Sequence, residues 1–141
     1  MRICGVELTG NDAVVCLLFL ENLQFNIPDC RVRKLTLPKE HSRENLQKFQ
    51  SEFAKLMSDY EVDKVAIRER APKGKFAGSA ISFKLEEVIQ LISEIEVEIL
   101  SPSQIKFAQK DNKLPNTFED TGLKEFQKDA FIVAYASHML N

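Results

Sequence analysis

Two apolar, β-branched runs at the start of the chain limit the folds that it can adopt. Residues 2–8 and 13–20 are separated by a short turn that contains Gly10 and Asn11. Such a turn between two strand-like runs predicts an antiparallel hairpin. A third strand is expected over residues 31–37, where basic residues alternate with apolar ones. Charged side chains would be costly on a buried face, so this strand is expected at an exposed edge of the sheet.

The rest of the chain alternates helical and strand-like patterns. Ser42 is an expected N-cap for a helix whose apolar residues recur at helical spacing as far as Tyr60. Further helices are expected over residues 79–93, 102–110 and from Thr121 onwards, and further strands over 62–67 and 96–100. Parallel strands require crossover connections. The order β-β-β-α-β-α-β-α, with a short extra helix after the fifth strand, therefore predicts an α/β fold with a mixed five-stranded sheet and helices on both faces.

Length and composition indicate one globular domain over residues 1–141. The chain is 44% hydrophobic and 28% charged, which is ordinary for a folded domain. The three cysteines, Cys4, Cys16 and Cys30, lie in or near apolar runs and show neither a disulfide framework nor a zinc-binding pair. No uninterrupted run of 18 apolar residues is present. We expect no membrane span, reduced thiols and a cytoplasmic location.

The order of the elements resembles that of the RNase H-like superfamily, and four short segments resemble its RuvC-like branch of Holliday-junction resolvases. Residues 3–7 (ICGVE) are similar to the glycine-apolar-acid start of that branch, and residues 65–69 (VAIRE) to its apolar strand ending in an acid. Residues 100–106 (LSPSQIK) and 128–134 (KDAFIVA) are similar to its proline-containing turn and its closing helix. The resemblance covers the whole chain, and we expect it to belong to a bacterial family of unknown function in this superfamily.

The resemblance implies a metal-dependent nuclease that hydrolyses phosphodiesters. Relatives of this kind hold Mg²⁺ or Mn²⁺ with carboxylates that meet at one edge of the sheet. Carried over by position, Glu7, Glu69 and Asp129 are the candidate catalytic residues and metal ligands. The resemblance also implies nucleic acid, either DNA or RNA, as the partner, and a homodimer.

Four residues depart from that pattern, the first being Glu7, which stands where the family usually has an aspartate. When the apolar residues of the 65–69 segment are aligned, Arg68 takes the place of the acid, and Glu69 falls on the opposite face of the strand. The family pairs two acids three residues apart in its last helix, and the residue three before Asp129 is Phe126. The two-metal centre is therefore expected to be incomplete, and the sequence leaves open whether the protein is an enzyme.

A local group of basic residues provides the candidate nucleic-acid contacts. The net charge of the chain is −2, so any such site must be a patch instead of a global positive field. Candidate phosphate-binding residues are Arg68, Arg70, Lys73 and Lys75. Arg68 has two interpretations, because a guanidinium can bind a phosphate or can pair with Glu7 or Asp129 in place of a metal ion. The second interpretation predicts a catalytically inactive module that binds nucleic acid or a protein partner.

Overall fold

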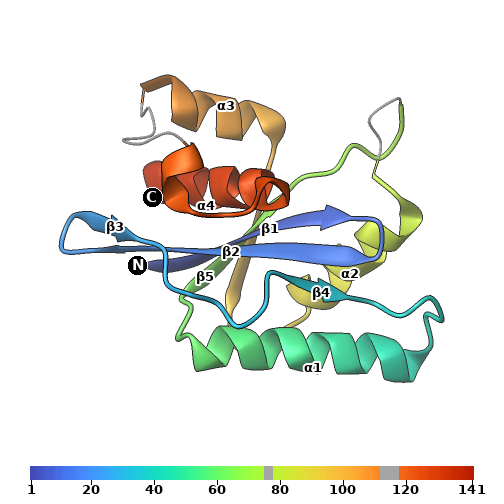
Figure 1. The fold of residues 1–141 in the computed structure, drawn as a ribbon. Helices are drawn as coiled ribbons and strands as arrows, with labels where there is room; N and C mark the ends of the chain where they lie inside the picture. The colour runs from blue at the N-terminus through green and yellow to red at the C-terminus, as the bar shows by residue number, and fades with distance from the viewer. Residues whose placement is uncertain (75–77, 112–117) are drawn as a thin grey trace.

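A single mixed sheet lies between two layers of helices (Figure 1). The computed structural model describes residues 1–74, 78–111 and 118–141. The strand order is β3-β2-β1-β5-β6, and β4 pairs with β2 beside that path. The strands are β1 (Arg2–Thr9), β2 (Asp12–Glu21), β3 (Gln24–Asn26), β4 (Lys34–Thr36), β5 (Lys64–Arg68) and β6 (Glu96–Leu100).

The predicted hairpin and parallel crossovers are confirmed. β1 and β2 are antiparallel, with Thr9 paired to Asp12 across a turn in which Gly10 has a φ of 57°. Glycine adopts this left-handed conformation without the steric cost that other residues meet. β5 runs parallel to β1, and β6 runs parallel to β5. The carboxyl ends of β1 and β5 consequently lie side by side.

The strand predicted over residues 31–37 is shorter than expected, and the described residues include one further short strand, so that they form a six-stranded mixed sheet. Two short strands, β3 and β4, both pair with β2. Asn22 and Leu23 have positive φ angles of 53° and 62°, which turn the chain straight back along β2. Pro28 lacks a backbone donor and follows β3 closely, so the chain leaves the sheet before it returns as β4.

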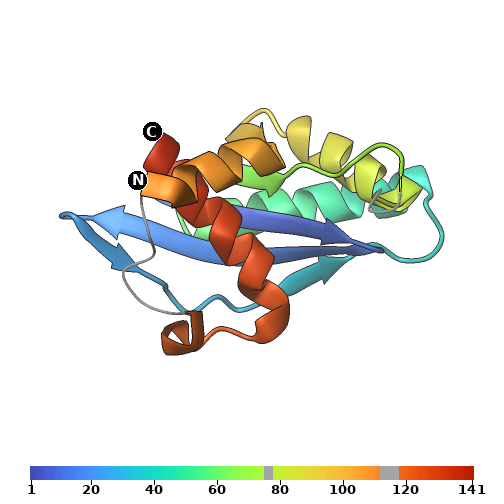
Figure 2. The same ribbon diagram turned by 90° about the horizontal axis from the view of Figure 1, so that it is seen from above.

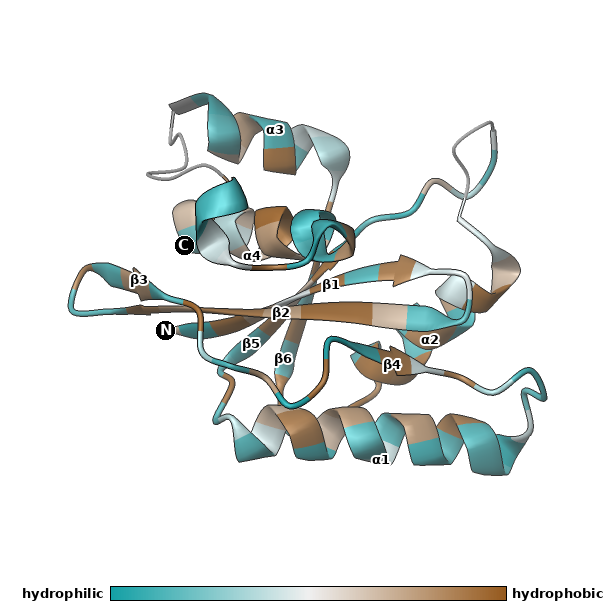
Figure 3. Cartoon of the chain, viewed as in Figure 1, coloured by the Kyte–Doolittle hydropathy of each residue, from teal (hydrophilic) through white to brown (hydrophobic). Residues whose placement is uncertain are grey.

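The helices divide between the two faces of the sheet (Figures 1 and 2). On one face lie α1 (Arg43–Asp59) and α2 (Ala80–Gln90). The predicted cap Ser42 and the cap Ser79 each accept a backbone N–H. On the other face lie α3 (Pro102–Asp111) and α4 (Lys128–Leu140). Figure 3 shows apolar residues of α1 on the side that meets the sheet, as an amphipathic helix requires.

The last helix begins later than predicted. Instead of starting near Thr121, α4 starts at Lys128, after the 3₁₀ segments η1 (Phe118–Thr121) and η2 (Glu125–Gln127). Gly122 has a φ of 76°, which interrupts any continuous helix through this region. The preceding loop was expected over residues 110–120, of which 112–117 lie outside the described residues.

Each face of the sheet has its own apolar core. Alternate residues of β1 face opposite ways, so Val6 packs toward α1 and α2 whereas Ile3 packs toward α4. Within the described residues, no helix is long and apolar enough to cross a membrane.

Candidate functional site

Glu7 stands near the end of β1 and faces the layer that contains α4. Only 14% of its side chain is exposed, so its carboxylate lies at the margin of the core. Burying a carboxylate costs free energy unless it gains partners. The partners of Glu7 come from β5 and from α4, as described below.

Asp129 comes to this edge because α4 packs closely against β1. Gly5 provides the space: a Cβ at that position would collide with the Ala130 carbonyl oxygen and lie 2.8 Å from the Ala134 Cβ. The small residues of α4 and the absent side chain of Gly5 allow the helix backbone to approach the strand. Asp129, in the first turn of α4, is thereby held over the end of β1.

Arg68 joins the two acids. It is the last residue of β5, one residue beyond the pairing of Val6 with Ile67, so it lies next to Glu7 in the sheet. Its Nη1 donates to Glu7 Oε2 at 3.3 Å and to Asp129 Oδ2 at 3.1 Å. The internal ion pair that the sequence left open is therefore present. Arg70 lies further out, with its Nη1 3.9 Å from the same Glu7 oxygen.

The surroundings of Glu7 raise the pKa of its carboxyl group. Burial raises the pKa of Glu7 from 4.5 to about 7, and a hydrogen bond to Asp129 and the charge of Asp129 add to the increase. The guanidinium groups of Arg68 and Arg70 lower the pKa of Glu7, but by less than the other effects raise it. Glu7 therefore takes up a proton at a higher pH than an ordinary glutamate does.

Glu69 lies apart from this pair. It follows the end of β5, its side chain is exposed, and its backbone N–H donates to the Leu100 carbonyl oxygen. The pKa of Glu86, in α2, is raised mainly by burial and also by the charge of Glu69. Glu69 is therefore close enough to α2 for its charge to act on Glu86, and α2 covers the face of the sheet opposite to α4.

Lys73 and Arg70 lie in the segment that leaves β5. Lys73 is exposed, whereas Arg70 is only 19% exposed and packs beside Gly78, where a Cβ would approach the Arg70 Cβ to 2.7 Å. Lys75, the fourth predicted phosphate-binding residue, lies outside the described residues.

The residues present do not fit a two-metal centre. Mg²⁺ requires about six oxygen ligands, several from carboxylates or water. In the part of the chain that the structure describes, no group of three or more His, Cys, Asp or Glu residues could hold a metal ion. The Arg68 guanidinium contacts the two carboxylates that do meet, so a cation is already bound at this edge.

One residue near the site had no signal in the sequence. Val14 of β2 pairs with Glu7 on one side and with Lys34 of β4 on the other. Directly paired residues of neighbouring strands point to the same face of a sheet. Lys34 therefore shares a face with Glu7, a relationship that depends on strand register and could not be read from local spacing.

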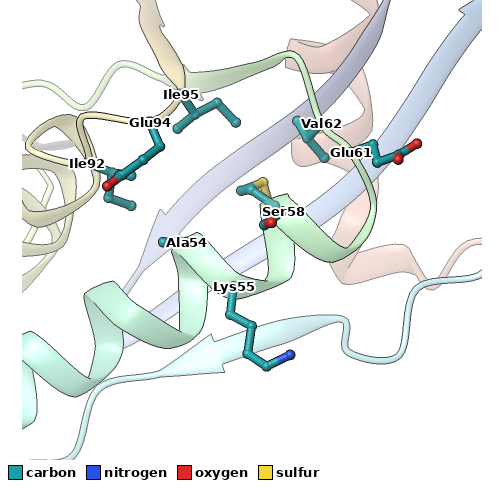
Figure 4. Close-up of a pocket in the computed structure, with 9 residues that line it drawn as sticks. Ala54, Lys55, Ser58, Glu61, Val62, Ile92, Glu94 and Ile95 are labelled. Carbon is teal, nitrogen blue, oxygen red and sulfur yellow. The ribbon is translucent and has the colours of Figure 1, made fainter.

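A separate hollow lies away from this edge (Figure 4). It has a volume of about 480 Å³ and is formed by α1, the turn that follows it and the connection between α2 and β6. Its lining is mostly apolar and includes Ala54, Met57, Val62, Ile92 and Ile95. It contains none of the candidate catalytic residues.

Comparison with known proteins supports the fold. A family model described as a protein of unknown function, DUF3010, matches residues 1–137. No curated protein sequence matches the chain. Among solved structures, Thermus thermophilus RuvC superposes with a TM-score of 0.73 at 14% identity, covering 99% of this chain and 94% of that chain.

Two complexes with DNA give similar results. T. thermophilus RuvC bound to a Holliday-junction substrate has a TM-score of 0.70 at 12% identity, covering 99% of this chain and 93% of that chain. The Fowlpox virus resolvase bound to Holliday-junction DNA has a TM-score of 0.56 at 16% identity, and the match covers 100% of both chains. The RNase H-like fold predicted from the sequence is confirmed. Identities this low show the fold alone.

Proposed function

The chain belongs to the DUF3010 family of proteins of unknown function, and we propose that it binds nucleic acid at the Glu7–Arg68–Asp129 edge without cleaving it. The observation that carries the proposal is the position of Arg68, which donates to both carboxylates. A guanidinium is a permanent cation, so it neutralises the acids without a metal ion. Metal-dependent hydrolysis is then not expected from the wild type.

The same arginine also supports binding. Of the described contacts of Arg68 with carboxylates, all use Nη1. Its side chain is 39% exposed, so part of it is accessible to a ligand such as a phosphate. Arg70 and Lys73 follow in the chain, and Lys75 completes the proposed phosphate-binding set. The resolvases with this fold were solved with junction DNA, which favours nucleic acid over a protein partner.

The second candidate is a nuclease that uses Mg²⁺ or Mn²⁺. It is favoured by the meeting of Glu7 and Asp129, from β1 and the last helix, where the resemblance places two metal ligands. It requires Arg68 to leave the carboxylates and Glu69 to turn to the other face of the sheet. We prefer the first candidate because both requirements oppose the observed arrangement.

Fluorescence anisotropy with labelled nucleic acids tests the first candidate. A four-way DNA junction, a DNA duplex and an RNA hairpin are titrated with protein at low salt and in the presence of EDTA. We expect the wild type to bind without metal, and Arg68→Ala to bind at least about tenfold more weakly, because it removes a cation and leaves two acids. Lys48→Ala, on the exposed side of α1, is the control and should bind like the wild type. Binding that needs Mn²⁺ and is accompanied by cleavage would favour the nuclease.

The resemblance also leads us to propose a homodimer that acts in the cytoplasm. Light scattering of the purified chain tests the oligomeric state, with a mass near 32 kDa expected for two copies of the 16.1 kDa chain. A mass of one chain at all concentrations would remove the dimer from the proposal and leave the binding site unchanged.

A further inference from the structure

Phe126 is an exposed aromatic residue next to the candidate site. It lies in η2, three residues before Asp129, and 47% of it is exposed. The resemblance places an acid at this position, so the aromatic side chain is a property of this chain. A single exposed apolar residue is common on protein surfaces. Its surroundings therefore decide whether it has a role.

The segment that carries Phe126 is fixed to the sheet. Gln127 is only 5% exposed, and its Nε2 donates to the Val15 carbonyl oxygen at 3.1 Å. The Gln127 Oε1 accepts the backbone N–H of Lys124 at 3.1 Å, which closes the short η2 turn. The backbone that carries Phe126 is consequently held by a buried anchor on β2.

Cations lie beside the aromatic rings of this region. The Lys34 Nζ is 6.0 Å from the centre of the Phe126 ring, and the Lys128 Nζ is 5.9 Å from the centre of the Phe118 ring. Lys34 also lies 3.8 Å from Asp12, and 54% of its side chain is exposed. Both lysines are exposed to solvent and remain accessible to a ligand.

Strand register connects this group to the candidate site. Lys34 and Glu7 flank Val14 in one row across three strands, so their Cα atoms are about 10 Å apart at the usual spacing of strands. Their side chains share the face that α4 covers. Phe126 and Lys34 thus extend the surface on which Glu7, Arg68 and Asp129 meet.

We propose that Phe126 is a stacking platform for an unpaired nucleobase, and that Lys34 binds an adjacent phosphate. Stacking on an aromatic ring with cations beside it is the usual chemistry of single-strand recognition. A base inside a continuous duplex has no free face to offer. The ligand class is therefore nucleic acid with unpaired or splayed bases, such as a single strand or the centre of a junction. This inference rests on the proposed function.

The absence of tryptophan provides a direct probe. The chain contains no Trp, so Phe126→Trp introduces a single fluorophore at the platform. A 12-nucleotide single-stranded DNA, a four-way junction and a blunt DNA duplex are titrated into this variant. We expect saturable quenching of the emission by the single strand and the junction, and little change with the duplex. Equal quenching by all three DNAs would overturn the stacking role.

Binding affinity gives an independent readout. Phe126→Leu keeps an apolar side chain but removes the aromatic face, and we expect it to weaken single-strand binding about tenfold while duplex binding stays within about twofold. Phe107→Leu is the matched control, because Phe107 is 63% exposed on α3, and it should bind like the wild type. Equal losses in the two variants, or none in Phe126→Leu, would overturn the inference.

The two proposals fail differently. A wild type that binds none of the nucleic acids at low salt contradicts the proposed function and this inference together, and would direct attention to a protein partner. A wild type that binds them, with no effect of Phe126→Leu, contradicts only the stacking role of Phe126.

Discussion

Arg68 donates a hydrogen bond to Asp129 across 3.1 Å, joining the end of β5 to the first turn of α4. The same guanidinium nitrogen reaches Glu7 at 3.3 Å. The residues that the sequence resemblance implies as metal ligands are thus held by a positively charged side chain. Two consequences follow, one for stability against pH and one for metal binding.

The pH dependence of stability should depend on Glu7. Its pKa in the folded protein, about 7, is above the ordinary value of 4.5. An acid whose pKa is higher in the folded state than in the unfolded state stabilises the fold when the pH is below its pKa in the unfolded state. This stabilisation is lost as the pH rises through its pKa in the folded state. The free energy of unfolding of the wild type should therefore decrease between pH 5 and pH 8. The decrease should be much smaller in Glu7→Gln.

Thermal unfolding at both pH values measures this effect. At pH 8 we expect Glu7→Gln to be more stable than the wild type by about 1 kcal/mol, because one pKa unit corresponds to about 1.4 kcal/mol and partial exposure reduces the effect. At pH 5 the two proteins should be nearly equal. Glu96→Gln, an exposed acid at the start of β6, is the control. If Glu7→Gln were instead less stable than the wild type at pH 8, the favourable pairing of the Glu7 carboxylate with Arg68 and Arg70 would outweigh the cost of burying it.

Gly5→Ala should displace α4 and destabilise the protein. The added methyl group would meet the Ala130 carbonyl oxygen and the backbone nitrogen of Ala134, neither of which can move without the helix. We expect a loss of about 3 kcal/mol, as for overpacked cores. Gly10→Ala is a matched control with open space around it, and its positive φ should cost about 1 kcal/mol. Chemical denaturation measures both, and equal losses would contradict the close packing.

The buried ion pair at the other end of the sheet gives a third prediction. Lys64 is 2% exposed, and its Nζ donates to Glu98 Oε2 and Asn141 Oδ1, both at 3.0 Å. Glu98 is 29% exposed and can reach water if its partner is removed. Glu98→Gln leaves a buried ammonium group and should cost about 3 kcal/mol, whereas Lys64→Met should cost about 1 kcal/mol. The reverse order in chemical denaturation would show that Glu98 is the less well solvated partner.

Local signals were sufficient to predict most of the fold. The sequence predicts the cap Ser42 and the helix that starts at Pro102 correctly, because capping depends on a few neighbouring residues. β3 was missed because a three-residue strand has no periodicity, and the turn before it uses Asn22 and Leu23 without a glycine.

The candidate site was only partly predictable. Aligning the apolar residues of β5 put Arg68 in the place of an acid, and the structure shows Arg68 in contact with Glu7 and Asp129. The contact of one guanidinium with two carboxylates depends on how closely α4 approaches β1. The alignment of Lys34 with Glu7 depends on the register of three strands. Neither relationship can be predicted from a short stretch of sequence.

Calorimetric titration of Mn²⁺ at pH 8 tests most directly whether Arg68 takes the place of a metal ion. We predict no saturable binding to the wild type at millimolar Mn²⁺. Arg68→Glu places a third carboxylate beside Glu7 and Asp129 and should bind Mn²⁺ saturably, whereas Arg68→Gln, which only removes the charge, should bind more weakly. Saturable binding to the wild type that is lost in both Glu7→Gln and Asp129→Asn would contradict the account and favour a metal-dependent nuclease.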